Sequence, residues 1–302
     1  MYTIKLENLT KIFGRGKRKV EAVRSISLEI EPKQVYGLLG PNGAGKTTTI
    51  RMILDLIRPT SGDVQVFGQS VRNNLPVLRR VGAMVEGAAM YPYLTGRRNL
   101  EVLARTFGEY DAANIQRLLE QVNMADRADR KFGGYSTGMK QRMGLAATLL
   151  HDPELIILDE PTNGLDPAGI QEMRYFIRDL VDNHNKTVLL SSHMLNEVEQ
   201  ICDRVAIINK GQVVQEGRVA DLLKMESVIS VTADPVDRAN EILQGKWTVS
   251  QNGTDALYVH AAYTETPEIV KQLVAHDLSV YEIKPHKQSL EEFFLRVTKE
   301  GA

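Results

Sequence analysis

The sequence predicts an α/β fold, in which a core built around a parallel sheet is followed by a smaller α+β domain. Three nearly unbroken apolar runs predict strands that are buried on both faces, as strands of a parallel sheet are: residues 35–39, 155–158 and 187–190. The length of 302 residues fits one large domain or two smaller ones. Because the residue pattern changes near residue 222, we predict domains at 1–222 and 223–302.

The bulk composition is that of an ordinary soluble chain, with 43% apolar and 25% charged residues. The formal net charge of −1 gives no overall basic field, which argues against nucleic acid as a partner. The single cysteine, Cys202, excludes an internal disulfide and a cysteine-rich metal site. No signal-peptide core begins the chain, and no apolar run approaches the ~20 residues that span a bilayer. We therefore expect any membrane part of a complex to come from another chain.

Two alternating segments, residues 3–9 and 23–30, predict antiparallel strands on either side of a turn. This turn is basic and runs from Gly14 to Lys19. One interpretation of the basic run is a solvated turn, and the other is a contact with lipid headgroups or phosphate. Phe13 comes just before it and, considered alone, is typical of a core residue.

A glycine-rich loop after residues 35–39 fits the phosphate-binding pattern G-x-x-x-x-G-K-[ST], and helical spacing follows it. Glycine lets several N–H groups converge on one anion, and the helix N-terminus adds partial positive charge. We expect Lys46 to reach the β- and γ-phosphates and the Thr47 hydroxyl to ligate Mg²⁺. The residues expected to hold the phosphates are Gly40, Pro41, Asn42, Gly43, Ala44, Gly45, Lys46, Thr47 and Thr48.

Two carboxylates follow the apolar run at residues 155–158. Ligands of open α/β sheets lie at the carboxyl ends of the strands, so Asp159 is expected to hold Mg²⁺ and Glu160 to orient the attacking water. By the same rule His193, after the third run, falls beside the phosphates. Surface acids or a lone structural histidine are the simpler interpretation of each feature alone, but the glycine loop favours a shared site.

Residues 88–150 predict a helical insertion in this core. Within it, Ser136 fits the N-cap of a helix that continues to Leu150. A further helix is expected to begin after Asp166, which also fits an N-cap. From local sequence alone, a capped helix is all that the stretch around Ser136 indicates.

The C-terminal pattern is strand, helix, two strands, helix and strand, the split order of ferredoxin-like domains. The pair Asn252-Gly253 marks the turn between the two middle strands. Ser289 and Glu292 predict a capping box at the start of a last helix that reaches Val297. A stabilising appendage and a dimer-bracing or regulatory role are both open for this domain.

Together these residues resemble the ATP-binding subunits of ABC transporters, over roughly residues 3–220. Residues 135–139 are similar to the signature motif, 163–166 to the D-loop and His193 to the switch histidine. The resemblance implies that Phe13 stacks on adenine and that Glu86 occupies the Q-loop position.

Two motifs depart from the family pattern. Thr137 and Met139 replace a glycine and the glutamine of the usual signature, whereas Ser136 and Gly138, which face the partner's γ-phosphate in the family, are present. Glu86 replaces the Q-loop glutamine, and a carboxylate can still ligate Mg²⁺ or accept a hydrogen bond but cannot donate one. These variants resemble the exporter branch for drugs, bacitracin and lantibiotic peptides.

The resemblance implies a P-loop NTPase core of the ABC type with an antiparallel β-subdomain and a helical subdomain. It implies ATP as the substrate, Mg²⁺ as the metal, and Lys46, Glu160 and His193 as catalytic groups of one subunit. A second copy of the chain, or a paralogue, would supply Ser136 and Gly138 across a dimer interface.

The implied function is to power a separate membrane permease from the cytoplasmic, inner face of the cell membrane, exporting a drug, peptide antibiotic or lipid-like molecule. Residues just after Glu86, including 91–94, are expected to touch the permease. One alternative is a soluble ABC ATPase acting on nucleic acid or ribosomes, but such proteins usually carry paired cassettes, long coiled coils or cysteine-rich zinc modules, which this sequence lacks. The other is a regulatory module without turnover, against which Glu160 and His193 argue.

Overall fold

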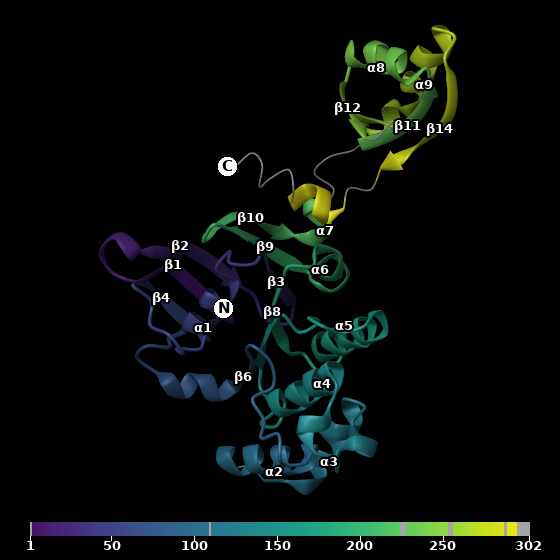
Figure 1. Ribbon diagram of the computed structural model, residues 1–302. Coiled ribbons are helices and arrows are strands. Elements are labelled where there is room, and N and C mark those ends of the chain that lie inside the picture. The colour runs from purple at the N-terminus through teal and green to yellow at the C-terminus, as the bar shows by residue number, and fades with distance from the viewer. Residues whose placement is uncertain (1, 109, 224–227, 253–255, 287–288, 295–302) are drawn as a thin grey trace. The chain divides into compact units, whose positions relative to one another are not determined.

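The structure is a computed structural model that describes residues 2–108, 110–223, 228–252, 256–286 and 289–294 (Figure 1). The chain divides into two compact units, a larger one that runs to Gly217 and a smaller one that begins at Arg218. The boundary predicted after residue 222 falls at the end of the short helix α7 (Val219–Leu222), which this division assigns to the smaller unit.

A mostly parallel sheet lies at the centre of the larger unit. Within the described residues it has six strands in the order β10-β9-β3-β8-β7-β6. They are β3 (Val35–Leu39), β6 (Val81–Met84), β7 (Leu155–Asp159), β8 (Thr187–Ser192), β9 (Arg204–Asn209) and β10 (Gln212–Arg218). Every residue of β3, β7 and β8 is buried, as the three apolar runs predict. Because β3 pairs with β8 and β8 with β7 in parallel, the carboxyl ends of these strands meet at one edge.

Helices connect and cover these strands. They are α1 (Lys46–Ile53), α2 (Gly96–Phe107), α3 (Ala112–Gln121), α4 (Thr137–Thr148), α5 (Pro167–Asp182) and α6 (Leu195–Ile201). Helices α2, α3 and α4 fall within the insertion predicted at residues 88–150, and α2 and α3 lie together at the bottom of Figure 1. Both predicted N-caps are confirmed, because Ser136 Oγ accepts from Met139 N over 3.3 Å and Asp166 Oδ1 from Gly169 N over 2.9 Å.

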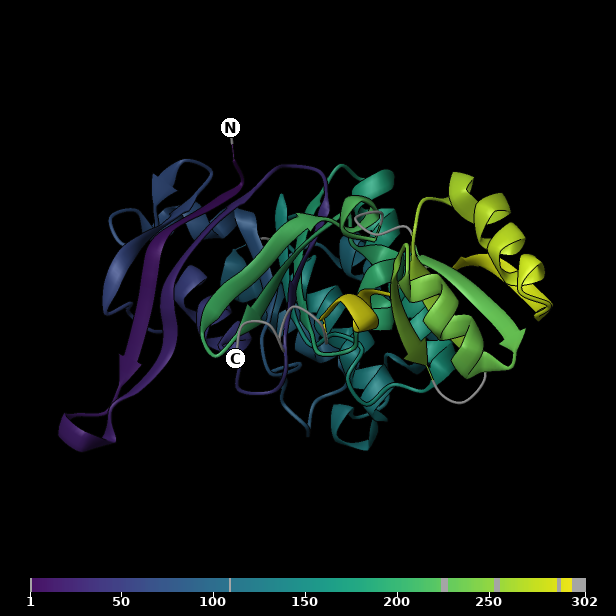
Figure 2. The ribbon, with the colours of Figure 1, turned by 90° about the horizontal axis from the view of Figure 1, so that it is seen from above.

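An antiparallel sheet packs beside the parallel one, as the alternating N-terminal segments predict. Its order is β2-β1-β4-β5 among the described strands β1 (Ile4–Phe13), β2 (Val20–Ile30), β4 (Ser61–Val66) and β5 (Gln69–Ser70). Its apolar face shares one core with α1 and the parallel sheet, in which Leu6, Ile26, Ile50 and Ile157 are fully enclosed. The turn from Gly14 to Lys19 projects from the ends of β1 and β2 in Figure 2.

The smaller unit contains a second antiparallel sheet. Its elements are β11 (Val228–Asp234), α8 (Val236–Gln244), β12 (Thr248–Asn252), β13 (Ala256–His260), α9 (Thr266–Ala275) and β14 (Ser279–His286). This is the predicted order of elements, and the sheet order β12-β13-β11-β14 inserts β13 between β11 and β12. Helices α8 and α9 pack on it through a core that includes Val231, Leu243, Val259 and Leu273.

The predicted capping box is present at the start of the last helical segment. Ser289 N donates to Glu292 Oε2 over 3.0 Å, and Glu292 N donates to Ser289 Oγ over 3.2 Å. Helical structure is described for residues 290–294, while the predicted continuation to Val297 lies outside the described residues. Gly253 of the predicted hairpin turn also lies outside them.

The single tryptophan of the chain, Trp247, belongs to the smaller unit and donates a hydrogen bond to a carboxylate there. The Trp247 indole N–H donates to Glu265 Oε1 over 3.0 Å, and Ala262 N–H donates to Glu265 Oε2 over 2.9 Å. Both bonds favour the ionised carboxylate and hold the pKa of Glu265 below its ordinary value.

We therefore predict an acid-dependent loss of stability in this unit. A lowered folded-state pKa stabilises the fold above the unfolded pKa of about 4.3, and this stabilisation is lost as the pH falls through the folded value. In urea titrations followed by Trp247 fluorescence, Glu265→Gln should flatten the dependence of the midpoint on pH in this acidic range. The exposed Glu241→Gln should keep the slope of the parent protein, and an unchanged slope in Glu265→Gln would contradict the assignment.

Candidate functional site

The glycine loop joins β3 to α1 in a conformation that side chains would prevent at two positions. Gly40 has φ of 155°, and a Cβ there would lie 2.2 Å from the Ile208 carbonyl oxygen. Gly45, the residue before α1, has φ of 111°, and its Cβ would lie 2.5 Å from the Ala22 carbonyl oxygen. Glycine is therefore needed here both for the left-handed backbone and for the close approach of neighbouring strands.

The loop forms one wall of a cavity of about 340 Å³. Residues from the ends of β7 and β8 form part of the opposite side. The lining consists of Ala22, Asn42, Gly43, Ala44, Gly45, Lys46, Thr47, Thr48, Glu160, Asn163 and His193. The structure thus brings most of the predicted phosphate loop together with Glu160 and His193, although these residues come from three distant parts of the sequence.

Lys46 is nearly enclosed at this site, with 5% of its side chain exposed. Its Nζ donates to the Gly40 carbonyl oxygen over 2.8 Å and lies 3.3 Å from Glu160 Oε1. A buried ammonium group is tolerated only when charge and hydrogen-bond partners compensate its lost hydration. These contacts fix a positive charge inside the curl of the loop.

Asp159 connects the loop to β8. Its Oδ1 accepts hydrogen bonds from Thr47 Oγ1 over 3.1 Å and from Ser191 Oγ over 2.6 Å. The hydroxyl and carboxylate oxygens of Thr47 and Asp159 are the ligand type that Mg²⁺ prefers. Within the described residues no group of three His, Cys, Asp or Glu side chains could cage a metal alone. The two oxygens of Thr47 and Asp159 leave the other Mg²⁺ positions for phosphate oxygens and water.

Glu160 follows Asp159 in the sequence, and its carboxylate lies between Lys46 and His193. One carboxylate oxygen faces Lys46, and the other lies 2.7 Å from Nδ1 of His193. The Glu160 backbone N–H donates to Ser191 Oγ over 3.0 Å, and its φ is +51°. Held from two sides and bordering the cavity, this carboxylate could accept a proton from a water molecule near the loop.

Phe13 and Glu86 are among the predicted residues that do not line this cavity. The ring of Phe13 is 42% exposed at the end of β1, with Lys11 Nζ 5.1 Å from its centroid, and it does not line the cavity. The Glu86 carboxylate pairs with the Arg51 guanidinium of α1 and does not line the cavity either. The adenine contact of Phe13 and the metal contact of Glu86 stay predictions.

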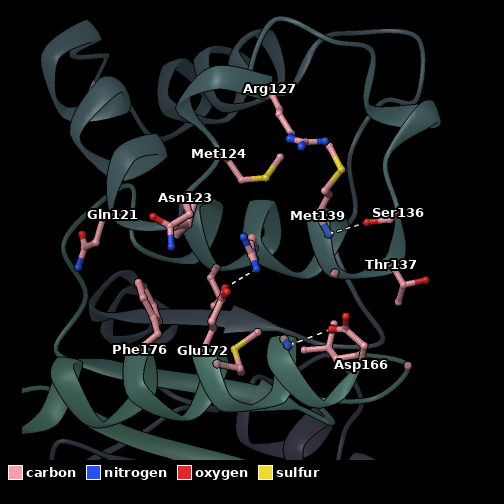
Figure 3. A pocket seen from close by; sticks show the side chains of 18 residues that line it. Gln121, Asn123, Met124, Arg127, Ser136, Thr137, Met139, Asp166, Glu172 and Phe176 are labelled. Carbon is pink, nitrogen blue, oxygen red and sulfur yellow. Dashed lines mark hydrogen bonds and ion pairs between the residues drawn. The ribbon is translucent and has the colours of Figure 1, made fainter.

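Ser136 and Gly138 line a different cavity, of about 550 Å³, which lies between α4 and α5 (Figure 3). None of the described residues that line one of these two cavities also lines the other. A single chain therefore does not bring its own Ser136 to its own glycine loop.

Sequence reasoning missed Ser191 and Ala22 as parts of the site, whereas Asn163 belongs to the segment that resembles the D-loop. Ser191 gave a weak signal, because a hydroxyl at the end of an otherwise apolar buried strand needs a hydrogen-bond partner. Ala22 lines the cavity only because β2 passes close to Gly45, and no residue pattern encodes that contact.

Comparison with known proteins identifies the family of this site. The family model described as ABC transporter matches residues 23–163. Over 300 residues the chain is 38% identical to the uncharacterized ABC transporter ATP-binding protein YhcH of Bacillus subtilis, covering 98% of this chain and 96% of that protein. This chain belongs to the ABC transporter ATP-binding proteins.

Other relatives and solved structures agree with this membership. The bacitracin transport ATP-binding protein BcrA of Bacillus licheniformis is 38% identical over 305 residues, covering 99% of this chain and 98% of BcrA. The dimeric structure of the ABC transporter cassette MJ0796 matches with a TM-score of 0.66 and 25% identity, over 72% of this chain and 98% of that one. A dimeric state of the same cassette, bound to ADP and Pi after hydrolysis, matches with a TM-score of 0.65 at the same identity and coverage.

The predicted ABC-type P-loop core, ATP as ligand with Mg²⁺, and ATP hydrolysis are thereby confirmed. ABC ATPases of this kind form dimers and work with membrane permease subunits, and action on nucleic acid or ribosomes is not favoured. Within the part of the chain that the structure describes, no helix is both long and apolar enough to cross a membrane.

The bonds of Ser191 lead to a prediction about this ABC ATPase. Ser191→Ala removes a donor to Asp159 and leaves the Glu160 N–H without its partner, so we expect about tenfold slower ATP hydrolysis in steady-state assays. Ser192→Ala is the matched control, because Ser192 Oγ accepts only from Met194 N among the described contacts. Equal losses in both variants would show that the Ser191 bonds have no special role.

Proposed function

We propose that this chain is the ATP-hydrolysing subunit of an exporter for a drug, peptide antibiotic or lipid-like molecule. The observation that carries the proposal is the cavity in which the glycine loop, Glu160 and His193 converge, with Asp159 hydrogen-bonded to Thr47 of that loop. The 38% identity to a bacitracin transport protein along nearly the whole chain supports the substrate class.

Phosphoryl transfer requires charge neutralisation and an aligned water more than covalent chemistry. Lys46 and the backbone N–H groups of the loop would bind the phosphates, while Thr47 and Asp159 would hold Mg²⁺. Bound Mg²⁺ supplies positive charge that stabilises the negative charge on the phosphate oxygens. Glu160 would accept the proton of the attacking water, and His193 would fix the orientation of that carboxylate.

The complete site would need two chains. Ser136 and Gly138 lie at the start of α4 beside a separate cavity, so they would act on ATP held by a partner subunit. The likeness to dimeric cassettes supports this arrangement. We propose a homodimer or a pair with a paralogue, in which ATP binding closes the interface and hydrolysis reopens it.

The permease contact would involve the segment after Glu86. Tyr91 and Tyr93 are 49% and 66% exposed, and their ring centroids lie 5.7 Å apart. Exposed aromatic residues are enriched at protein interfaces, which supports a contact with the permease here. We place the subunit at the cytoplasmic, inner face of the cell membrane, with no nucleic acid partner.

The domain assignment also remains a proposal. Residues 1–222 would form the ATP-binding domain, with a helical subdomain at about 88–150, and residues 223–302 an accessory ferredoxin-like domain. The order of strands in the smaller unit supports the last assignment.

Replacing the proposed general base tests the proposed mechanism. Glu160→Gln keeps the size of the side chain but cannot accept the proton, so hydrolysis should slow by about 10²–10⁴-fold while ATP binding persists. Filter binding and phosphate release measure the two effects, and a closed dimer should accumulate with ATP in gel filtration. Glu241→Gln serves as the control for loss of a surface carboxylate, and full turnover in Glu160→Gln would exclude the base role.

A bulky charge at Ser136 tests the two-chain site. In the Glu160→Gln background, Ser136→Arg should prevent the ATP-dependent dimer measured by light scattering, because the side chain would occupy the space facing the partner's phosphate. ATP binding to the monomer should change little, since Ser136 does not line the loop cavity. Thr106→Arg, at an exposed position of α2, is the matched control, and undiminished dimerisation of Ser136→Arg would refute the arrangement.

A further inference from the structure

The cavity between α4 and α5 extends well beyond Ser136 and Gly138. Its volume of about 550 Å³ is within the range of sites that enclose small organic molecules, roughly 300–1,000 Å³. Much of its lining is apolar and nearly enclosed, since Met124, Leu145 and Met173 are 1%, 2% and 4% exposed. Binding a phosphate group at the first turn of α4 would not require this apolar interior.

The apolar part of the cavity suits the ring system of an apolar ligand. Three methionines, Met124, Met139 and Met173, line it together with the ring of Phe176. Methionine is flexible and polarisable, and its sulfur makes favourable contacts with aromatic rings. In Figure 3 the Phe176 ring points into the space between α3 and α5.

Of the four charged side chains that line the cavity, three already have partners. Asp166 accepts from Gly169 N over 2.9 Å, and Arg142 pairs with Glu172. For Arg127, no carboxylate partner is found among the described residues. Figure 3 shows its guanidinium group directed toward the same space as the Met124 and Met139 side chains. The cavity therefore combines an apolar interior with one solvent-exposed arginine, Arg127, that no described carboxylate pairs with.

We propose that this cavity is a second ligand site, which takes a small amphiphilic molecule with an apolar ring system and one anionic group. The ring system would lie among the methionines and Phe176, and the anionic group would pair with the Arg127 guanidinium. A charged hydrogen bond of this kind is stronger than a neutral one and fixes the orientation of the ligand.

From its location, we expect a ligand in this cavity to affect ATP hydrolysis. The cavity is bounded by α4, which begins next to Ser136, and by α5, which begins next to Asp166. A ligand between them holds the first turn of α4 at a fixed distance from α5, and so opposes any approach of the two helices during closure. We expect slower ATP hydrolysis. This consequence rests on the proposed function, whereas ligand binding itself does not.

Binding is tested on the full-length protein with 8-anilinonaphthalene-1-sulfonate, which carries an apolar ring system and one anion. Fluorescence and calorimetric titrations should give one site per chain. Arg127→Gln should weaken binding about tenfold by removing a charged hydrogen bond. The matched control is Arg130→Gln, which changes the net charge equally but removes an exposed arginine that does not line the cavity, and it should bind as the parent does.

A neutral probe separates the charge contact from hydrophobic binding. N-phenyl-1-naphthylamine lacks the sulfonate, so Arg127→Gln should leave its affinity within about twofold. Phe176→Ala should weaken both probes, because both place a ring system in the cavity. No saturable binding, or equal weakening by Arg127→Gln and Arg130→Gln, would overturn the proposal.

The regulatory consequence has its own readout. Anionic probe at the dissociation constant of the parent protein fills about half of the parent sites but only about one-tenth of the Arg127→Gln sites, so it should slow ATP hydrolysis clearly in the parent and little in the variant. If the probe binds as expected and hydrolysis stays unchanged, the site is retained and its influence on closure is refuted. If the protein hydrolyses no ATP in any condition, the proposed function fails while the binding result stands.

Discussion

The structure of the nucleotide site depends on the carboxylate of Asp159, which joins parts of the chain that are far apart in sequence. Its Oδ1 accepts from Thr47 at the start of α1 and from Ser191 near the end of β8. These groups can meet because β3, β8 and β7 are consecutive parallel strands whose carboxyl ends share one edge. The parallel register therefore assembles the oxygen ligands, and the hydrogen bonds keep them at that edge. Glu160 is placed by the same network, since its backbone N–H also donates to Ser191.

A second constraint concerns what one chain cannot supply to its own ATP. The helical segment ends in α4, whose cap Ser136 borders another cavity and not the glycine loop. Neutralising the charge of the ATP phosphates requires cations and hydrogen-bond donors on several sides of the phosphates. In the proposed site, one chain supplies these groups on some sides only. In the proposed two-chain site, association of two subunits would be part of the chemistry, so that nucleotide occupancy would be coupled to movement.

Much of this arrangement could be predicted from the sequence, because its signals are local. The glycine loop between an apolar run and a helical pattern, and the caps Ser136 and Asp166, depend only on neighbouring residues. What could not be predicted depends on which strands and helices become neighbours. The contact of β2 with Gly45 and the ion pair between Arg51 and Glu86 both join segments brought together by folding. Apolar residues continue at helical spacing from Ile50 to Ile57, but helix α1 ends at Ile53. Ile57 still packs against the core without being part of the helix.

The ion pair between Arg51 and Glu86 has a consequence for how this protein can diverge. The resemblance to ABC ATPases leads one to expect glutamine at the position of Glu86, and a neutral amide there would leave the Arg51 guanidinium without this anion. Because the two charges interact directly, the effects of exchanges at these two positions should be coupled. Correlated substitution at positions 51 and 86 would then mark lineages in which the loop after β6 is tied electrostatically to the phosphate-binding helix.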